Sequence, residues 1–257
     1  MLKAFSKKDP PPHRVKPVPV AVLRNVAATA ATSHCPHRNA TADMTILAFF
    51  FLLRPGEYTG GSSDTVPFRF QDVQLFIGPT RLDLATASIA SLRQATFGTL
   101  TFTNQKNGVR NEVIGHASSG DPVLCPVQAL IRCVIHLRMH NAPPTTTLAT
   151  WYQDDHPQPI LPRHITDALR TAVTILGPTL GFLPEDVSAR CLRAAGATAL
   201  LCADVDDCHI SLLGRWRSDE MLRYLHLSTQ QKMKDFSRKM LHGGAFNLIP
   251  NQLVPSY

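Results

Sequence analysis

Leu213-Gly214-Arg215-Trp216-Arg217-Ser218, near the end of the chain, is the stretch from which the fold can be worked out. A single tyrosine, Tyr224, follows Trp216 by eight residues. Upstream, Ser188–Thr198 carries two early arginines and is otherwise apolar, which predicts a helix with a cationic start. Farther upstream, Arg54-Pro55-Gly56-Glu57 follows directly after a hydrophobic run. No common fold-stabilising pattern requires all of these features, so together they indicate a functional site.

The composition favours an anionic partner. The chain has 257 residues, a formal net charge of +7 and a pI of about 9.3. A chain of this length can form one large domain with a substantial core. Of its 26 basic residues 18 are arginine, whose planar fork suits phosphate oxygens. Nucleic acid is the commonest partner of such a protein.

The cysteines and the longest apolar run argue against a secreted, a zinc-binding or a membrane-spanning protein. The six cysteines form no C-x-x-C pair, and we interpret them as reduced, buried thiols of an intracellular protein that is not secreted. His34-Cys35-Pro36-His37 and Cys208-His209 lack the paired spacing of a zinc site, so no metal site is expected. Met44–Leu53 spans only ten residues, which is too short for a bilayer and predicts a core helix.

The first 60 residues predict a lead-in followed by two helices. Residues 1–19 are basic and proline-rich and read as a disordered lead-in, whereas 20–241 form one domain and 242–257 a loose tail. A short helix is expected at Val20–Ala31. Asp43 is expected to cap a helix over Met44–Leu53, which Pro55-Gly56 then breaks.

Residues 67–116 predict a small antiparallel sheet. Phe68–Phe70 and Val73–Ile77 are strand-like, and Thr99–Thr103 alternates apolar and polar residues. Asn107-Gly108 is typical of a hairpin turn, with a return strand over 109–115, so Lys106 is expected at the hairpin tip. A small inserted helix is expected over Asp83–Ala95.

The remaining segments predict helices, so the expected fold class is mainly α with a small antiparallel β-sheet. The predicted helices are Pro122–His140, Arg163–Leu176, Ser188–Ala203, Val205–Leu213 and Asp219–Met240, and a loop is expected over Asn141–Pro159.

These residue types suit transfer of a phosphodiester to a tyrosine. Arg54 and Arg193 can hold non-bridging phosphate oxygens with paired, permanently charged donors. Lys106 is the only lysine between Lys16 and Lys232, and lysine, unlike arginine, can release its proton as a general acid. A solvated lysine at a hairpin tip is the alternative interpretation.

Tyr224 is the candidate nucleophile. Arginines surround it in sequence, and cations assist deprotonation of a phenol. The alternative is an ordinary aromatic residue of a helix core. Trp216 can likewise be a core indole or can donate its N–H to a phosphate oxygen.

The ordered motifs resemble the tyrosine recombinase (phage integrase) superfamily over about residues 40–240. They are Arg54-x-x-Glu57, Lys106, Arg190-x-x-Arg193, Leu-Gly-x-Trp216 and Tyr224. Phe-Phe-Phe-Leu-Leu-Arg-Pro-Gly-Glu and Leu-Gly-Arg-Trp look like the integrases of eukaryotic mobile elements such as Cryptons.

The resemblance implies a DNA breaking–rejoining enzyme of the tyrosine recombinase fold. Tyr224 would form a 3′-phosphotyrosyl link, and Lys106 would protonate the leaving oxygen. Arg54 and Arg193 would bind the scissile phosphate, with Arg190 at the family's catalytic histidine position and Trp216 at the His/Trp position. Double-stranded DNA is the implied partner and a homotetramer the implied assembly, with no cofactor, membrane or small-molecule substrate. The implied location is the nucleus in a eukaryote and otherwise the cytoplasm.

Three features depart from the family and leave alternatives open. Arg190 stands where the family has histidine, Arg54 and Lys106 are 52 residues apart, and no N-terminal core-binding domain is visible. A catalytically inactive or domesticated DNA-binding relic is therefore the alternative function. A type IB topoisomerase is a third possibility, and a basic helical binding module is the fallback.

Overall fold

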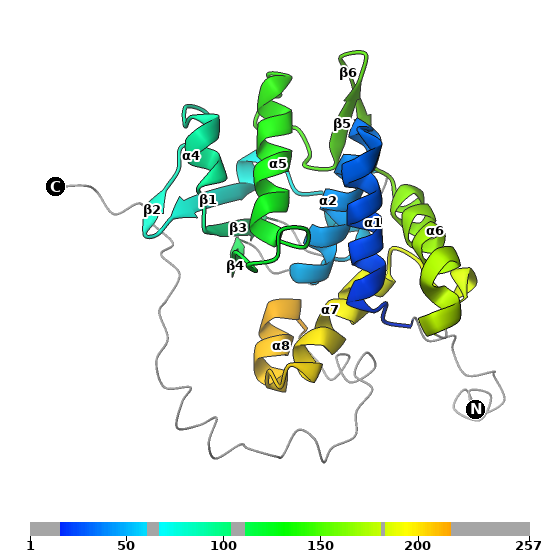
Figure 1. Ribbon diagram of the computed structural model, residues 1–257. Helices are drawn as coiled ribbons and strands as arrows, with labels where there is room; N and C mark the ends of the chain where they lie inside the picture. The colour runs from blue at the N-terminus through cyan, green and yellow to red at the C-terminus, as the bar shows by residue number, and fades with distance from the viewer. Residues whose placement is uncertain (1–15, 61–66, 104–110, 181–182, 217–257) are drawn as a thin grey trace, which may run out of the picture.

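The computed structural model describes residues 16–60, 67–103, 111–180 and 183–216. This part of the chain is mainly helical with a small antiparallel sheet, which confirms the predicted fold class (Figure 1). The helices are α1 (Val20–Ser33), α2 (Pro36–Phe50), α3 (Pro55–Tyr58), α4 (Ile89–Arg93), α5 (Pro126–Met139), α6 (Pro162–Leu180), α7 (Cys191–Cys202) and α8 (Asp207–Gly214). The strands are β1 (Val73–Ile77), β2 (Thr80–Arg81), β3 (Phe97–Phe102), β4 (Glu112–Ala117), β5 (Thr150–Gln153) and β6 (His156–Pro159).

The main sheet has the order β2-β1-β3-β4, with every neighbouring pair antiparallel. β3 and β4 form the predicted hairpin, whose described stem runs from Phe97 opposite Ala117 to Phe102 opposite Glu112. The tip, with Lys106, lies outside the described residues. Helix α5 packs against this sheet and α2 against α5, so the core lies between the sheet and the helices (Figure 1).

Helix α2 is the buried centre of the molecule, as predicted, but its predicted start at Asp43 is wrong. The helix begins at Pro36, because a proline in the first turn needs no hydrogen-bonded N–H. Asp43 lies in the middle of the helix and is 5% exposed. Its carboxylate accepts from Arg132 Nε of α5 at 2.8 Å, so a partner 89 residues away accounts for the buried charge.

Two further sequence predictions are corrected. The predicted loop 141–159 contains the β5–β6 hairpin, in which Thr150 pairs with Pro159 and Gln153 with His156. Its turn residues Asp154 and Asp155 have φ of 48° and 61°. Short-chain aspartates tolerate this left-handed conformation. The helix predicted over Asp83–Ala95 is only α4, one turn long, after the short edge strand β2.

The described residues before α1 contact the domain. Val18 is 3% exposed, and Lys16 Nζ lies 2.8 Å from the Asp186 carboxylate. All six cysteines are free thiols, but Cys202 and Cys208 are exposed, so the prediction that all six are buried is wrong. Within the described ranges no helix combines the length and apolarity of a membrane span. The helix predicted over 219–240 lies outside these ranges.

Candidate active site

The candidate site is built around the C-terminal end of α2. After α2 the chain turns at Leu52, which has a left-handed φ of 50°. Two backbone carbonyls just beyond the helix accept from distant arginines: Arg193 Nη1 donates to Leu52 O at 2.6 Å, and Arg215 Nη1 donates to Phe51 O at 3.2 Å. Carbonyl groups at the end of a helix lack helical partners and carry partial negative charge, so cations stabilise them.

Arg54 follows this turn and is oriented by Glu57. The Arg54 backbone N–H donates to Glu57 Oε2 at 2.7 Å, and its guanidinium Nη1 donates to Oε1 at 3.2 Å. The Glu57 side chain is 7% exposed, whereas that of Arg54 is 32% exposed. Pro55-Gly56 therefore does more than end the preceding helix, because it begins the short helix α3 that brings Glu57 back to Arg54. A partly exposed, oriented guanidinium is suited to receive an anion.

Arg193 lies on α7, at the buried side of the candidate site. It is 5% exposed, and its Nη2 donates to Gly214 O in addition to the bond with Leu52 O. The Trp216 ring lies 4.3 Å from its guanidinium carbon, a cation–π contact. Gly196 permits this arrangement, because a Cβ there would lie 2.2 Å from Phe49 O of α2. Two predicted site residues, Arg193 and Trp216, are thus in direct contact.

Arg215 is one of two site residues that the sequence analysis missed. Its side chain is fully buried, donates to Leu213 O at 2.9 Å and to Leu52 O at 3.2 Å, and lies 3.8 Å from the Phe102 ring. Its Nη2 also donates to Glu57 Oε2 at 3.3 Å, so Glu57 joins Arg54 to Arg215. Burial lowers the Arg215 pKa to about 10, and the Glu57 carboxylate opposes that shift. The only sequence signal was an arginine directly after the helix-ending Leu-Gly pair.

His116 of β4 is the second missed residue and also lies at the end of α2. Its ring packs edge-on against Phe51 at 4.7 Å, and it hydrogen-bonds the Phe50 backbone. Burial lowers the pKa of His116 to about 4, so the ring is neutral at pH 7. Its buried Nε2 has no hydrogen-bond partner among the described residues. Nothing in the sequence pattern singled out this histidine.

The other predicted site residues lie at the edge of the described cluster or outside it. Arg190 is exposed at the start of α7, one helical turn before Arg193. Lys106 and Tyr224 lie outside the described residues. Among the described residues, β3 ends at Phe102, whose ring lies 3.8 Å from the Arg215 guanidinium carbon, and Trp216 is the last described residue before Tyr224.

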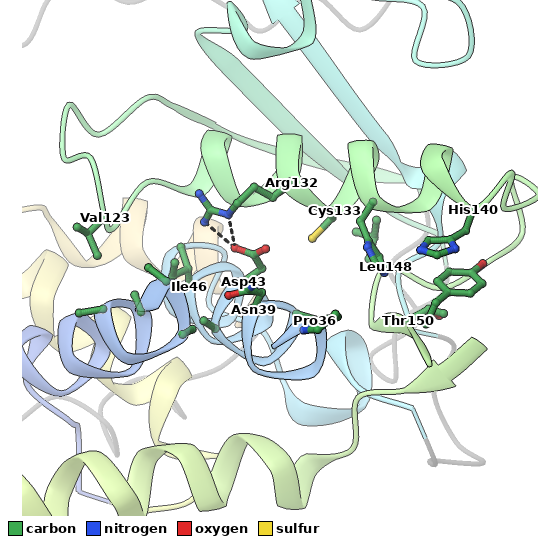
Figure 2. A pocket seen from close by; sticks show the side chains of 18 of the residues that line it. Pro36, Asn39, Asp43, Ile46, Val123, Arg132, Cys133, His140, Leu148 and Thr150 are labelled. Atoms are coloured by element: carbon green, nitrogen blue, oxygen red, sulfur yellow. Dashed lines mark hydrogen bonds and ion pairs between the residues drawn. The ribbon is translucent and has the colours of Figure 1, made fainter. Parts of the chain in front are cut away.

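A separate cavity of about 780 Å³ lies between α1, α2 and α5. Figure 2 shows the Asp43–Arg132 ion pair reaching across it from α2 to α5. Burial raises the pKa of Asp43 to about 6, although Arg132 opposes the shift. Arg54, Arg193 and Arg215, which together form the arginine cluster of the candidate site, do not line this cavity. Among the described residues no three histidine, cysteine or acidic side chains group as metal ligands.

Solved structures include chains with a similar fold. No family model matches the chain, and no curated protein matches it. The chain is similar to a structure of the Tn1549 transposon integrase in complex with circular intermediate DNA, at 14% identity and a TM-score of 0.48. The similarity covers 94% of this chain and 68% of that one. A similarity at this level says nothing about function.

Proposed function

We propose that the chain is a DNA breaking–rejoining enzyme of the tyrosine recombinase type. The convergence of Arg54, Arg193 and Trp216 at one end of α2 carries this proposal, because they come from three distant parts of the chain. Phe102 and Trp216, which precede Lys106 and Tyr224 by four and eight positions, contact Arg215 and Arg193 of this cluster. A mobile-element integrase, a homotetramer on double-stranded DNA and, in a eukaryotic host, a nuclear location belong to the same proposal.

In the proposed reaction the Tyr224 oxygen attacks the phosphorus of the DNA backbone. A tyrosine–phosphorus bond forms while the bond to the 5′ oxygen breaks, and the phenol proton passes to water. Lys106 donates a proton to the departing 5′ oxygen, which leaves as a hydroxyl. Arg54 and Arg193 stabilise the charge on the non-bridging oxygens, and loss of one such preorganised donor raises a barrier by about 3–4 kcal/mol.

The present position of Arg193 favours a second candidate function, a DNA-binding relic without catalysis. The guanidinium is buried and donates to two backbone carbonyls, at Leu52 and Gly214. To bind a phosphate, Arg193 would replace at least one of these hydrogen bonds by a bond to a phosphate oxygen. A relic would keep these bonds as purely structural ones and would bind DNA through its exposed cations.

A nicked suicide substrate pool distinguishes the two functions. The strand break lets the 5′-hydroxyl product diffuse away, so an active enzyme accumulates as a covalent protein–DNA adduct on a denaturing gel. We expect an adduct that maps to Tyr224 and is absent from Tyr224→Phe. Tyr152→Phe, on strand β5, is the matched control and should form the adduct normally. An adduct that persists in Tyr224→Phe contradicts the nucleophile assignment, and retained DNA binding without any adduct supports the relic.

A further inference from the structure

Two helices begin with the same three residue types. Helix α2 starts with Pro36-His37-Arg38 and α6 starts with Pro162-Arg163-His164. Their first turns lie side by side, because the rings of His37 and His164 are 4.5 Å apart between centroids and nearly perpendicular. This pairing brings two arginines and two imidazoles from distant segments to one part of the surface.

The paired helix starts line an open recess of about 470 Å³. Its walls include His37, His164 and Arg163 together with Trp151 of β5, whose ring lies 5.0 Å from that of His37. None of the described residues that line it is acidic. A neighbouring hollow of about 260 Å³ shares both histidines and adds Arg38 and one acidic residue, Asp167. Arg38 and Arg163 are both exposed, so their guanidinium groups are accessible.

The geometry of His164 points to a missing acceptor. The Leu161 N–H donates to His164 Nδ1 at 3.2 Å, and Arg163 Nε donates to His164 Nε2 at 3.4 Å. Burial and Arg163 lower the pKa of His164, and Asp167 opposes this shift, so the neutral ring is favoured. A neutral imidazole has one acceptor nitrogen and can satisfy only one of these two donors. An anionic oxygen beside Arg163 would accept from the donor that the ring leaves unsatisfied.

We propose that this recess binds a backbone phosphate of DNA, outside the candidate active site. The inference rests on the proposed function for the identity of the anion as DNA. Arginine forks and N–H donors in a recess that no described acidic side chain lines match a phosphodiester.

The recess is close enough to the candidate site to contact the same duplex. Gly60 N–H donates to Ile160 O at 2.9 Å, next to Pro159, which lines the recess. Gly60 is six positions after Arg54 in the chain, so their Cα atoms lie at most about 22 Å apart. On B-DNA this distance corresponds to about six phosphates of one strand, at roughly 3.4 Å of helix axis each.

The test is the salt dependence of binding of the full chain to a fluorescent 30-base-pair duplex. The variant Arg38→Gln/Arg163→Gln, called the recess variant, removes one cation from the recess and one from the neighbouring hollow. Arg81→Gln/Arg93→Gln, on β2 and α4, is the control, because it removes the same charge from exposed positions elsewhere. Thermal denaturation of all variants checks that they remain folded.

We expect the recess variant to reduce the slope of log K against log salt by about 1.8, since each lost phosphate contact removes about 0.9. The control should keep the wild-type slope within about 0.5. Equal slopes in both variants, with steep wild-type salt dependence, would overturn the recess but leave the proposed function intact. A wild-type chain that does not bind DNA would remove both proposals. The covalent-adduct assay is scored separately, so the two failures are distinguishable.

Discussion

Replacing Arg215 by methionine tests whether the arginine cluster holds the site together. The arginine contacts the carbonyls of Phe51, Leu52 and Leu213 and the carboxylate of Glu57, and its side chain is fully buried. Breaking a buried ion pair by removing one partner costs about 3–5 kcal/mol. Methionine preserves much of the apolar volume, so most of the loss reflects polar groups left without a partner. We therefore expect the free energy of unfolding to fall by about 3–5 kcal/mol.

Urea denaturation followed by circular dichroism measures this loss. A double-mutant cycle with Glu57→Gln isolates the pair, and we expect a coupling energy of about 1–3 kcal/mol, because contacting residues are not additive. Arg93→Met, at an exposed position on α4, is the control and should change stability by less than about 0.5 kcal/mol. A loss below about 1 kcal/mol for Arg215→Met would show that the cluster does not depend on this residue, and the reasoning would be refuted.

Two further variants test the packing and the buried charge around α2. Gly196→Ala places a methyl group 2.2 Å from Phe49 O. We expect the free energy of unfolding, measured by thermal or urea denaturation, to fall by about 1–3 kcal/mol. An unchanged stability would mean that α7 can move away from α2 freely. Asp43→Asn tests the raised pKa of about 6. Because burial favours the protonated carboxyl in the folded state, Asp43 contributes stability below its unfolded pKa of 3.8 that is lost as pH rises through about 6. Between pH 4 and pH 7 the wild type should therefore lose roughly 2–3 kcal/mol relative to Asp43→Asn, and parallel pH profiles would contradict the assignment.

The helices and the main sheet could be predicted because their signals are local. Apolar periodicity located α5, and alternation around Asn107-Gly108 located the β3–β4 hairpin. Asp43 misled the prediction because aspartate favours helix starts, whereas its actual partner, Arg132, is 89 residues away. The β5–β6 hairpin was missed because its prolines and threonines resemble a loop.

The candidate site was predictable in part. Arg54, Arg193 and Trp216 stand out by residue type and spacing, and the structure places all three at the end of α2. Arg215 and His116 could not be found in this way, because their roles depend on backbone carbonyls at Phe51 and Phe50. A sequence states which side chains can donate a hydrogen bond, but only the folded chain shows which carbonyls lack a partner.

The contact between Trp216 and Arg193 gives the protein a built-in optical reporter. The emission of an indole responds to a cation 4.3 Å away, and the chain has only one other tryptophan, Trp151. In a Trp151→Phe protein the fluorescence would come from Trp216 alone. A phosphate that draws Arg193 away from its carbonyls would therefore change the emission at the moment the guanidinium moves. Stopped-flow mixing with DNA could time that movement against the formation of the covalent adduct.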